Sequence, residues 1–220
     1  MRPGVLILPI SILILILIFV LEAPALAEER ANADLFDEAN RFRQEGSFDL
    51  ALQSINRSLD LDPNQTEAWV LKGEIALYNL SDRNMAAESF DRALGIDPEN
   101  ARAWYEMGNS LSFLGRIDEA LSAYNRSLEI DPENAKAWNN RGLILGVLGD
   151  YVDAELCFGR ALDANPNLAE AAQNRGNALW ALGRYEEALE CFDSALKINP
   201  ELAGSWKGAA AVLQSLGRDE

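Results

Sequence analysis

The sequence predicts an all-α solenoid of five helix pairs with a closing helix at its C-terminus, preceded by a hydrophobic N-terminal segment. Two observations predict this fold. First, Pro98, Pro132, Pro166 and Pro200 are each 34 residues apart, and a fixed period of this size is typical of stacked repeat arrays. Second, each period contains two stretches with apolar residues at helical spacing. For 220 residues, one elongated domain plus a targeting segment is the simplest arrangement.

Residues 101–134 illustrate one repeat. The first helix has a packing face of apolar and small residues: Trp104, Met107, Gly108, Leu111 and Leu114. After the break at Gly115-Arg116, the second helix has its own face: Ile117, Ala120, Leu121, Tyr124, Ser127, Leu128 and Ile130. Pro132 ends this helix, because proline lacks an amide donor and disfavours a helical residue before it. Asn100 and Asn134 are predicted N-caps.

The small residues Gly108 and Ala120 are expected where the two helices touch, with Trp104 and Tyr124 filling the wider gaps beside them. These residues resemble the tetratricopeptide repeat family, whose pattern of Trp, Gly, Tyr, Gly, Tyr, Ala, Phe, Ala and Pro spans 34 residues. The resemblance recurs in five consecutive repeats and covers about four fifths of the chain. It implies a right-handed solenoid that binds partner segments and catalyses nothing itself.

Four tryptophans share one position of the repeat, and we expect them in the core rather than at a cofactor site: Trp69, Trp104, Trp138 and Trp206. A buried tryptophan removes roughly 150–250 Å² from water. The fifth repeat has Ala172 at this position instead.

Residues 1–27 differ from all that follows. Val5–Leu21 carries no charge, and Ala25 and Ala27 fit the small-x-small rule of signal peptidase. The apolar run is slightly long for a signal peptide and slightly short of the ~20 residues of a comfortable membrane span. Cleavage after Ala27 and retention as an N-terminal membrane anchor both remain open. Because Arg2 puts positive charge only at the N-terminal side, both place the repeats outside the membrane, secreted or anchored.

The repeats are expected in order from residue 32. The first, residues 32–65, is degenerate and lacks the tryptophan, as expected of a terminal repeat with one face in water. The second, residues 66–100, carries one extra residue around Leu80-Ser81-Asp82, which we place in the turn between its helices, where added length costs little. The remaining units are residues 101–134, 135–168, 169–202 and a half-repeat closing helix at 203–220.

Composition excludes several functions. The formal charge of −16 repels nucleic acid and anionic lipid, so membrane contact is expected only through an uncleaved N-terminal segment. The chain has no histidine and no glycine-rich phosphate loop, and its carboxylates fall at solvent-facing helix positions. We therefore expect no enzyme, no cofactor and no metal. Cys157 and Cys191 occupy equivalent sites of adjacent repeats, beyond the roughly 7 Å limit for a disulfide, and are interpreted as packed thiols.

The resemblance implies that the first helix of each pair lines a concave groove. Residues off the packing face are then candidates for ligand contact: Arg102, Tyr105, Asn109, Ser112 and Phe113 in the third repeat, Lys136, Asn139, Asn140 and Leu143 in the fourth, and Gln173, Asn174, Asn177 and Trp180 in the fifth. Asparagine and glutamine can pair with the backbone of an extended peptide. Trp180 is a candidate aromatic anchor. We predict a polar groove for an extended or helical segment.

The carboxylate-clamp pattern of the family is only partly present. Asn109 and Asn140 fit it, but Tyr105, Glu170 and Asn174 occupy the positions of its lysines and arginines. A ligand recognised by its C-terminal carboxylate is therefore not the expectation.

Four N-x-S/T sequons are possible glycosylation sites outside the membrane: Asn56, Asn64, Asn79 and Asn125. Asn-Arg-Ser occurs twice at one repeat position, which the repeat pattern alone also explains. Asn64 and Asn79 are expected in turns and are the better candidates.

The function we predict is that of a non-catalytic protein-interaction scaffold of the cell exterior or envelope, binding partner segments in the concave groove. The alternative is a structural or accessory subunit of an envelope assembly, such as a secretion, pilus or glycosylation machinery, that docks through its convex surface.

Overall fold

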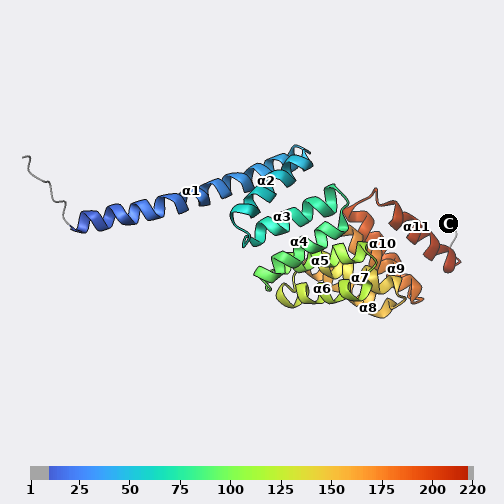
Figure 1. Ribbon diagram of the computed structural model, residues 1–220. Coiled ribbons are helices and arrows are strands. Elements are labelled where there is room, and N and C mark those ends of the chain that lie inside the picture. Colours follow the sequence, from blue (N-terminus) through green and yellow to red (C-terminus); the bar gives the residue numbers. More distant parts are fainter. Residues whose placement is uncertain (1–9, 218–220) are drawn as a thin grey trace, which may run out of the picture. The chain divides into compact units, whose positions relative to one another are not determined.

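The computed structural model describes residues 10–217, and the side chains from Leu26 onward with the exception of Glu28. Over residues 10–217 the chain has eleven α-helices, one π-helical turn and no strand (Figure 1). The chain forms two compact units, residues 1–82 and residues 83–220. The boundary between the two units falls within the second repeat.

The first unit contains α1 (Ile10–Gln44), α2 (Phe48–Leu61), α3 (Thr66–Glu74) and the π-helical turn η1 (Ile75–Asn79). Its core is made of fully buried residues from all four elements: Ala39, Ala51, Ile55, Ala68 and Ile75. The first helix of the degenerate repeat is thus the C-terminal part of α1, which packs against α2.

The signal or anchor segment expected at residues 1–27 lies almost wholly outside the described side chains. Among the parts of the chain that the structure describes, we find no helix with the length and apolar character needed to cross a membrane.

The extra residue of the second repeat is accommodated in η1 rather than in the turn that follows it. The amide of Leu80 donates to the carbonyl of Ile75 at 3.1 Å, five residues earlier, which is the hydrogen bond of a π-helix. Ser81 then adopts φ 58°, and it occupies the turn where the other repeats have a glycine of positive φ. A widened helical turn absorbs one residue without breaking the backbone hydrogen bonds.

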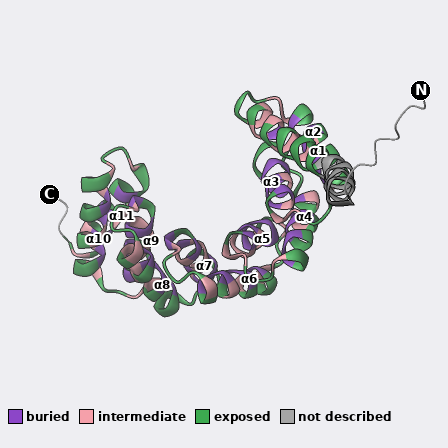
Figure 2. Cartoon of the chain, turned by 90° about the vertical axis from the view of Figure 1, so that its left-hand side faces the viewer, coloured by how far each residue is buried: buried purple, intermediate pink, exposed green. Residues whose placement is uncertain are grey.

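The second unit contains eight helices: α4 (Arg83–Ile96), α5 (Ala101–Phe113), α6 (Ile117–Ile130), α7 (Ala135–Val147), α8 (Tyr151–Ala164), α9 (Ala169–Ala181), α10 (Tyr185–Ile198) and α11 (Ala203–Ser215). Within this unit α5, α7, α9 and α11 follow the inner side of a curve, and α4, α6, α8 and α10 follow the outer side (Figure 2). The N-caps predicted at Asn100 and Asn134 are confirmed, because their side chains accept from Ala103 N and Ala137 N.

The close approach predicted at Gly108 is confirmed. A Cβ at this position would lie 2.6 Å from Cε1 of Tyr124 on the paired helix, and Ala120 is fully buried. The fourth and fifth repeats repeat the contact, with Gly142 against Phe158 and Gly176 against Phe192. Helices α5 and α6, and their equivalents, therefore pack with a glycine against an aromatic face.

Each tryptophan at the shared repeat position forms a hydrogen bond that links its helix to the end of the preceding repeat. The indole Nε1 donates to a proline carbonyl six residues earlier, at 2.8–2.9 Å, in four pairs: Trp69 to Pro63, Trp104 to Pro98, Trp138 to Pro132 and Trp206 to Pro200. The first three pack against core clusters. Trp206 is 59% exposed, so its predicted place in the core is wrong. In the described chain no second helix follows α11 to cover it.

Candidate functional site

The predicted groove residues lie on α5, α7 and α9, along the inner side of the second unit (Figure 2). Four of them form a chain of side-chain amides that we call the amide ladder: Asn109, Asn139, Asn140 and Asn174. Asn174 Nδ2 donates to Asn139 Oδ1 at 3.0 Å, and Asn139 Nδ2 donates to Asn140 Oδ1 at 3.2 Å. Asn140 Nδ2 donates to Asn109 Oδ1 at 2.8 Å. The ladder thereby joins three successive repeats.

Two members of the ladder are buried, with Asn109 6% and Asn139 9% exposed. Asn109 Oδ1 also accepts from the hydroxyl of Tyr124 at 2.7 Å, and its Nδ2 donates to Glu106 Oε2 at 3.1 Å. Its polar atoms are thus occupied within the protein. Asn109 and Asn139 form the floor of the groove, while the half-buried Asn140 and Asn174 are better placed to meet a ligand.

Two tyrosines stand beside the ladder. The rings of Tyr105 and Tyr124 have centroids 6.2 Å apart, and Asn140 Nδ2 lies 3.4 Å from the Tyr105 hydroxyl. Burial raises the pKa of both tyrosines above the ordinary value of 10. Both hydroxyls are therefore protonated at neutral pH, and that of Tyr124 is committed to Asn109.

Apolar side chains line the groove on either side of the amide ladder. A pocket of about 320 Å³ lies between α5 and α7, and its apolar lining is Phe113, Ile117, Leu143, Ile144, Val147 and Leu148. A second pocket of about 210 Å³ lies between α7 and α9 and shares Leu143 and Val147 with the first. We call these two adjoining pockets the inner groove.

The walls are unusually exposed for apolar residues. Phe113 is 57%, Leu143 43% and Val147 88% exposed, so apolar side chains face solvent along this part of α5 and α7. The sequence pattern predicted Phe113 and Leu143 as groove residues, but not Val147 or Tyr151, which lines the second pocket. For Val147, the signal in the sequence was an apolar residue that lies off the packing face at the end of the first helix of its repeat. The groove is therefore polar only at its floor.

The remaining candidates are spread more widely. Gln173 accepts from Ser205 of α11 at 3.3 Å, and Trp180 is 44% exposed with Nε1 3.4 Å from Ser215 Oγ. Asn177 is exposed and lines the second pocket. Arg102 and Lys136 are exposed on α5 and α7 and line neither pocket of the inner groove.

The sequons differ in access. Asn56 and Asn125 are exposed on α2 and α6, but Ser58 and Ser127 of the same sequons are fully buried. Ser127 Oγ donates to the carbonyl of Ala101 at 2.8 Å, and Ser58 Oγ bonds to an asparagine side chain. The hydroxyl groups of these two sequons are therefore part of the helix packing.

The other two sequons are more open. Asn64 is exposed in a turn, as predicted, whereas Asn79 is the last residue of η1 rather than a turn residue. Asn79, Leu80 and Ser81 are all exposed, so this sequon is the most accessible of the four.

Both cysteines are free thiols, and burial raises the pKa of each. Within residues 10–217 no three or more histidine, cysteine or acidic side chains are grouped so that they could hold a metal ion. What the arrangement offers is a surface with hydrogen-bonding amides at its floor and apolar side chains at its walls.

The comparison with solved structures agrees with this architecture. PilW, described as a widely conserved type IV pilus biogenesis factor, has a TM-score of 0.74 and 25% identity, covering 85% of this chain and 86% of that chain. The Pseudomonas aeruginosa pilF has a TM-score of 0.77 and 20% identity, with 87% of each chain covered. The first TPR of Spaghetti (RPAP3), bound to the HSP90 peptide SRMEEVD, has a TM-score of 0.53 and 27% identity, covering 55% of this chain and 96% of that chain.

Comparison with curated protein sequences gives no significant match. Two family models described as tetratricopeptide repeat do match the chain, one at residues 36–101 and one at residues 101–134, 135–168 and 169–202. Together they cover well over half of the sequence. The chain therefore belongs to the tetratricopeptide repeat family.

Proposed function

We propose that this protein is a non-catalytic scaffold that binds a segment of a partner protein in the inner groove. The observation that carries the proposal is the exposure of Phe113, Leu143 and Val147 above the amide ladder. Exposed apolar walls supply binding free energy, and Asn140 and Asn174 supply hydrogen bonds that fix a peptide backbone. Membership of the tetratricopeptide repeat family supports the same role, as does the peptide-bound structure of the Spaghetti repeat domain.

The ligand that fits is an extended or helical segment with apolar side chains. Its apolar residues enter the two pockets on either side of Leu143 and Val147, and its backbone polar groups face Asn140 and Asn174. Trp180, at the far end of α9, adds an exposed aromatic surface. Recognition of this kind reads side chains along the segment rather than a terminal carboxylate.

The test compares two matched variants of one repeat. Val147→Glu puts a charge into the inner groove, whereas Val152→Glu puts the same charge on α8, where Val152 is 64% exposed and lines neither pocket. Peptides are first enriched on the native chain from a displayed random library, and their affinities for both variants are then measured. We expect Val147→Glu to weaken binding at least about tenfold, or 1.4 kcal/mol, and Val152→Glu to leave it unchanged. Equal affinity of the two variants, or no enriched peptide, would contradict the proposal.

We further propose that the scaffold works in the cell envelope, exported by residues 1–27. The support is the uncharged run Val5–Leu21 followed by Ala25 and Ala27, together with the similarity to PilW, a pilus biogenesis factor. Intact mass of the protein from fractionated cells tests this. A species that begins at Glu28 in the exported fraction, or a full-length species in the membrane fraction, is expected. Recovery of the full-length chain only from the cytoplasm would contradict it.

A further inference from the structure

A larger cleft lies on the opposite side of the second unit from the inner groove. It has a volume of about 790 Å³, and its lining residues come from α4, α5, α6 and the turn before α6. Helices α4 and α6 both lie on the outer side of the curve (Figure 2). Trp104, Met107 and Leu111 form the floor, and the small Ala87 and Ala123 stand at its sides. We call it the outer cleft. Its volume falls within the ~300–1,000 Å³ typical of ligand sites.

The same space one repeat later is filled by the protein itself. Thirty-four residues after Ala87 and Met107, the chain has Leu121 and Arg141. Leu121 packs against the core clusters on both sides of it. The Arg141 guanidinium lies 5.8 Å from the ring centroid of Trp138 and donates to Cys157 Sγ at 2.8 Å. Larger side chains thus occupy the position that the outer cleft leaves open.

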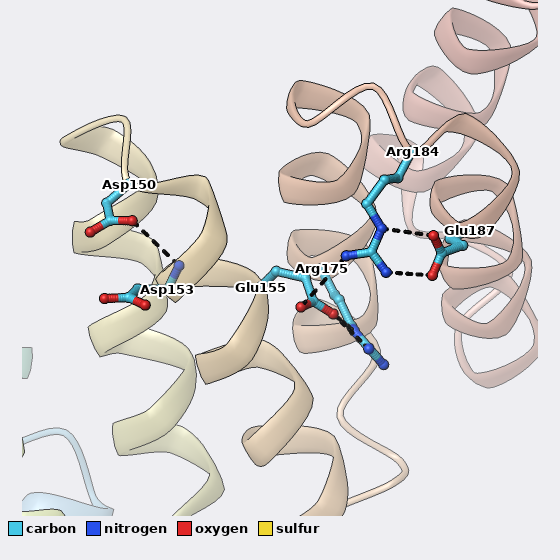
Figure 3. A network of polar contacts seen from close by, with 6 residues as sticks. All are labelled: Asp150, Asp153, Glu155, Arg175, Arg184 and Glu187. Carbon is cyan, nitrogen blue, oxygen red and sulfur yellow. Dashed lines mark hydrogen bonds and ion pairs between the residues drawn. The ribbon is translucent and has the colours of Figure 1, made fainter.

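At the equivalent position two repeats later, Glu155 forms ion pairs with Arg175 and Arg184 (Figure 3). Arg175 Nε donates to Glu155 Oε1 at 2.7 Å, and Arg184 Nη1 lies 3.9 Å from Glu155 Oε2. Arg184 in turn pairs with Glu187 on α10. Of these three equivalent spaces, the outer cleft alone combines an apolar floor with small side chains at its edges.

The rim of the outer cleft is acidic. Glu88 and Asp91 line it from α4, both exposed, and among the described residues neither takes part in an ion pair. The cations of the α6 wall are already paired, Arg116 with Glu119 and Arg126 with two glutamates. The carboxylates of α4 therefore offer uncompensated negative charge beside an apolar floor.

We propose that the outer cleft binds a partner protein segment in which a bulky apolar side chain is flanked by lysine or arginine. The apolar side chain fills the space above Trp104, Met107 and Leu111, as Leu121 fills the equivalent space of the next repeat. The flanking cations pair with Glu88 and Asp91. This site lies on the other side of α5 from the inner groove, so the protein holds two partner segments at once.

The test uses two synthetic peptides with a common leucine-phenylalanine-leucine core, one flanked by lysines and one by glutamates. Both are acetylated, amidated and dye-labelled, and binding to the full-length chain is followed by fluorescence anisotropy. We expect the lysine peptide to bind at least about tenfold more tightly than the glutamate peptide, because only its charges complement the rim. Failure of the lysine peptide to bind, or equal binding of the two, would overturn the proposal.

Two variants locate the binding. Ala87→Leu fills the outer cleft with the side chain that the next repeat has at Leu121, so the fold tolerates it, and we expect it to weaken the lysine peptide about tenfold. Glu88→Lys with Asp91→Lys changes only exposed positions and should reverse the preference toward the glutamate peptide. Val147→Glu in the inner groove should change neither affinity. If the lysine peptide binds Ala87→Leu and the double variant as it binds the native chain, the outer cleft is not its site.

Discussion

The hydroxyl of Tyr124 donates a 2.7 Å hydrogen bond to Oδ1 of Asn109, and the same oxygen accepts from Asn140 of the next repeat at 2.8 Å. One atom of α5 therefore joins α5 both to its paired helix α6 and to the following repeat. At the equivalent position the neighbouring repeats have Phe90, Phe158 and Phe192, which carry no hydroxyl. Among these repeats, the hydrogen bond from the second helix to the floor of the inner groove is thus a feature of the third.

Tyr124→Phe tests how much the hydrogen bond between Tyr124 and Asn109 contributes to stability. The ring keeps its packing against Gly108, as the phenylalanines of the other repeats do, while Asn109 Oδ1 keeps its bond to Asn140. We expect the free energy of unfolding to fall by about 1 kcal/mol, the net worth of one hydrogen bond, in urea denaturation followed by circular dichroism. An unchanged midpoint would show that the hydroxyl contributes nothing to stability.

Tyr124→Phe also shows how much of the stability lost at high pH is due to Tyr124. Burial raises the pKa of Tyr124 above that of the unfolded chain, which is about 10. A raised folded pKa means that the stability contribution is fully present below pH ~10 and is lost as the pH rises from there through the folded pKa. We expect the native protein to lose more stability between pH 9 and 11 than Tyr124→Phe does, in parallel urea titrations at about these values. Parallel loss in both proteins would contradict the assignment, since Tyr105, whose pKa is also raised, is present in both.

Gly108→Ala tests the closest helix contact. The added Cβ would lie 2.6 Å from Cε1 of Tyr124, so α5 and α6 must separate, at a cost of typically 1–3 kcal/mol. Gly95→Ala is the control, because nothing lies within 4 Å of its Cβ position in α4. Alanine is the better helix former by up to about 1 kcal/mol, so this variant should unfold at the same or a higher temperature. A decrease in stability as large as that of Gly108→Ala would show that the steric explanation is wrong.

The sequence predicted most of the fold because the repeat encodes local contacts. Proline, glycine and the helical faces mark helix ends and packing sides, so the N-caps at Asn100 and Asn134 and the Gly108 contact followed from pattern alone. The π-helical turn did not follow from the pattern, because one extra residue near Leu80 can enlarge a turn or, as here, widen the end of a helix. Trp206 is exposed because burial depends on the neighbour that follows, which its own position cannot specify.

The candidate site was less predictable than the fold. Pattern identified Asn109 and Asn139 as lying off the packing face, but it could not show that their amides bond to each other across repeats and lie buried. Val147 lies off the packing face at the end of its helix, but that position alone could not show that it lines a pocket. The outer cleft was missed as well, because it depends on the absence of a large side chain at Ala87, which becomes visible only against Leu121 of the next repeat.

Arg141 and Arg175 occupy equivalent positions and should respond differently to the same substitution. Arg141 Nε is buried with no hydrogen-bond partner among the described residues, which costs about 1–3 kcal/mol, and the third repeat has Met107 at this position. Arg175 instead donates to Glu155, whose side chain is only 17% exposed. The substitution also removes the cation–π contact with Trp138, worth about 0.5–1 kcal/mol, and the hydrogen bond to Cys157 Sγ, worth about 0.5–1.5 kcal/mol. Because these losses offset the relieved cost at Nε, we expect Arg141→Met to change the free energy of unfolding by less than Arg175→Met does.

Arg175→Met should lower the free energy of unfolding by about 1.5–3 kcal/mol, the range for hydrogen bonds to charged groups. It leaves Glu155 with Arg184 alone, at 3.9 Å. Urea denaturation of the two variants in the same buffer provides the comparison, and the side chain introduced is identical in both. Destabilisation of both proteins by the same amount would mean that the unpaired Nε of Arg141 carries no cost, and that the two arginines contribute through their aliphatic packing instead.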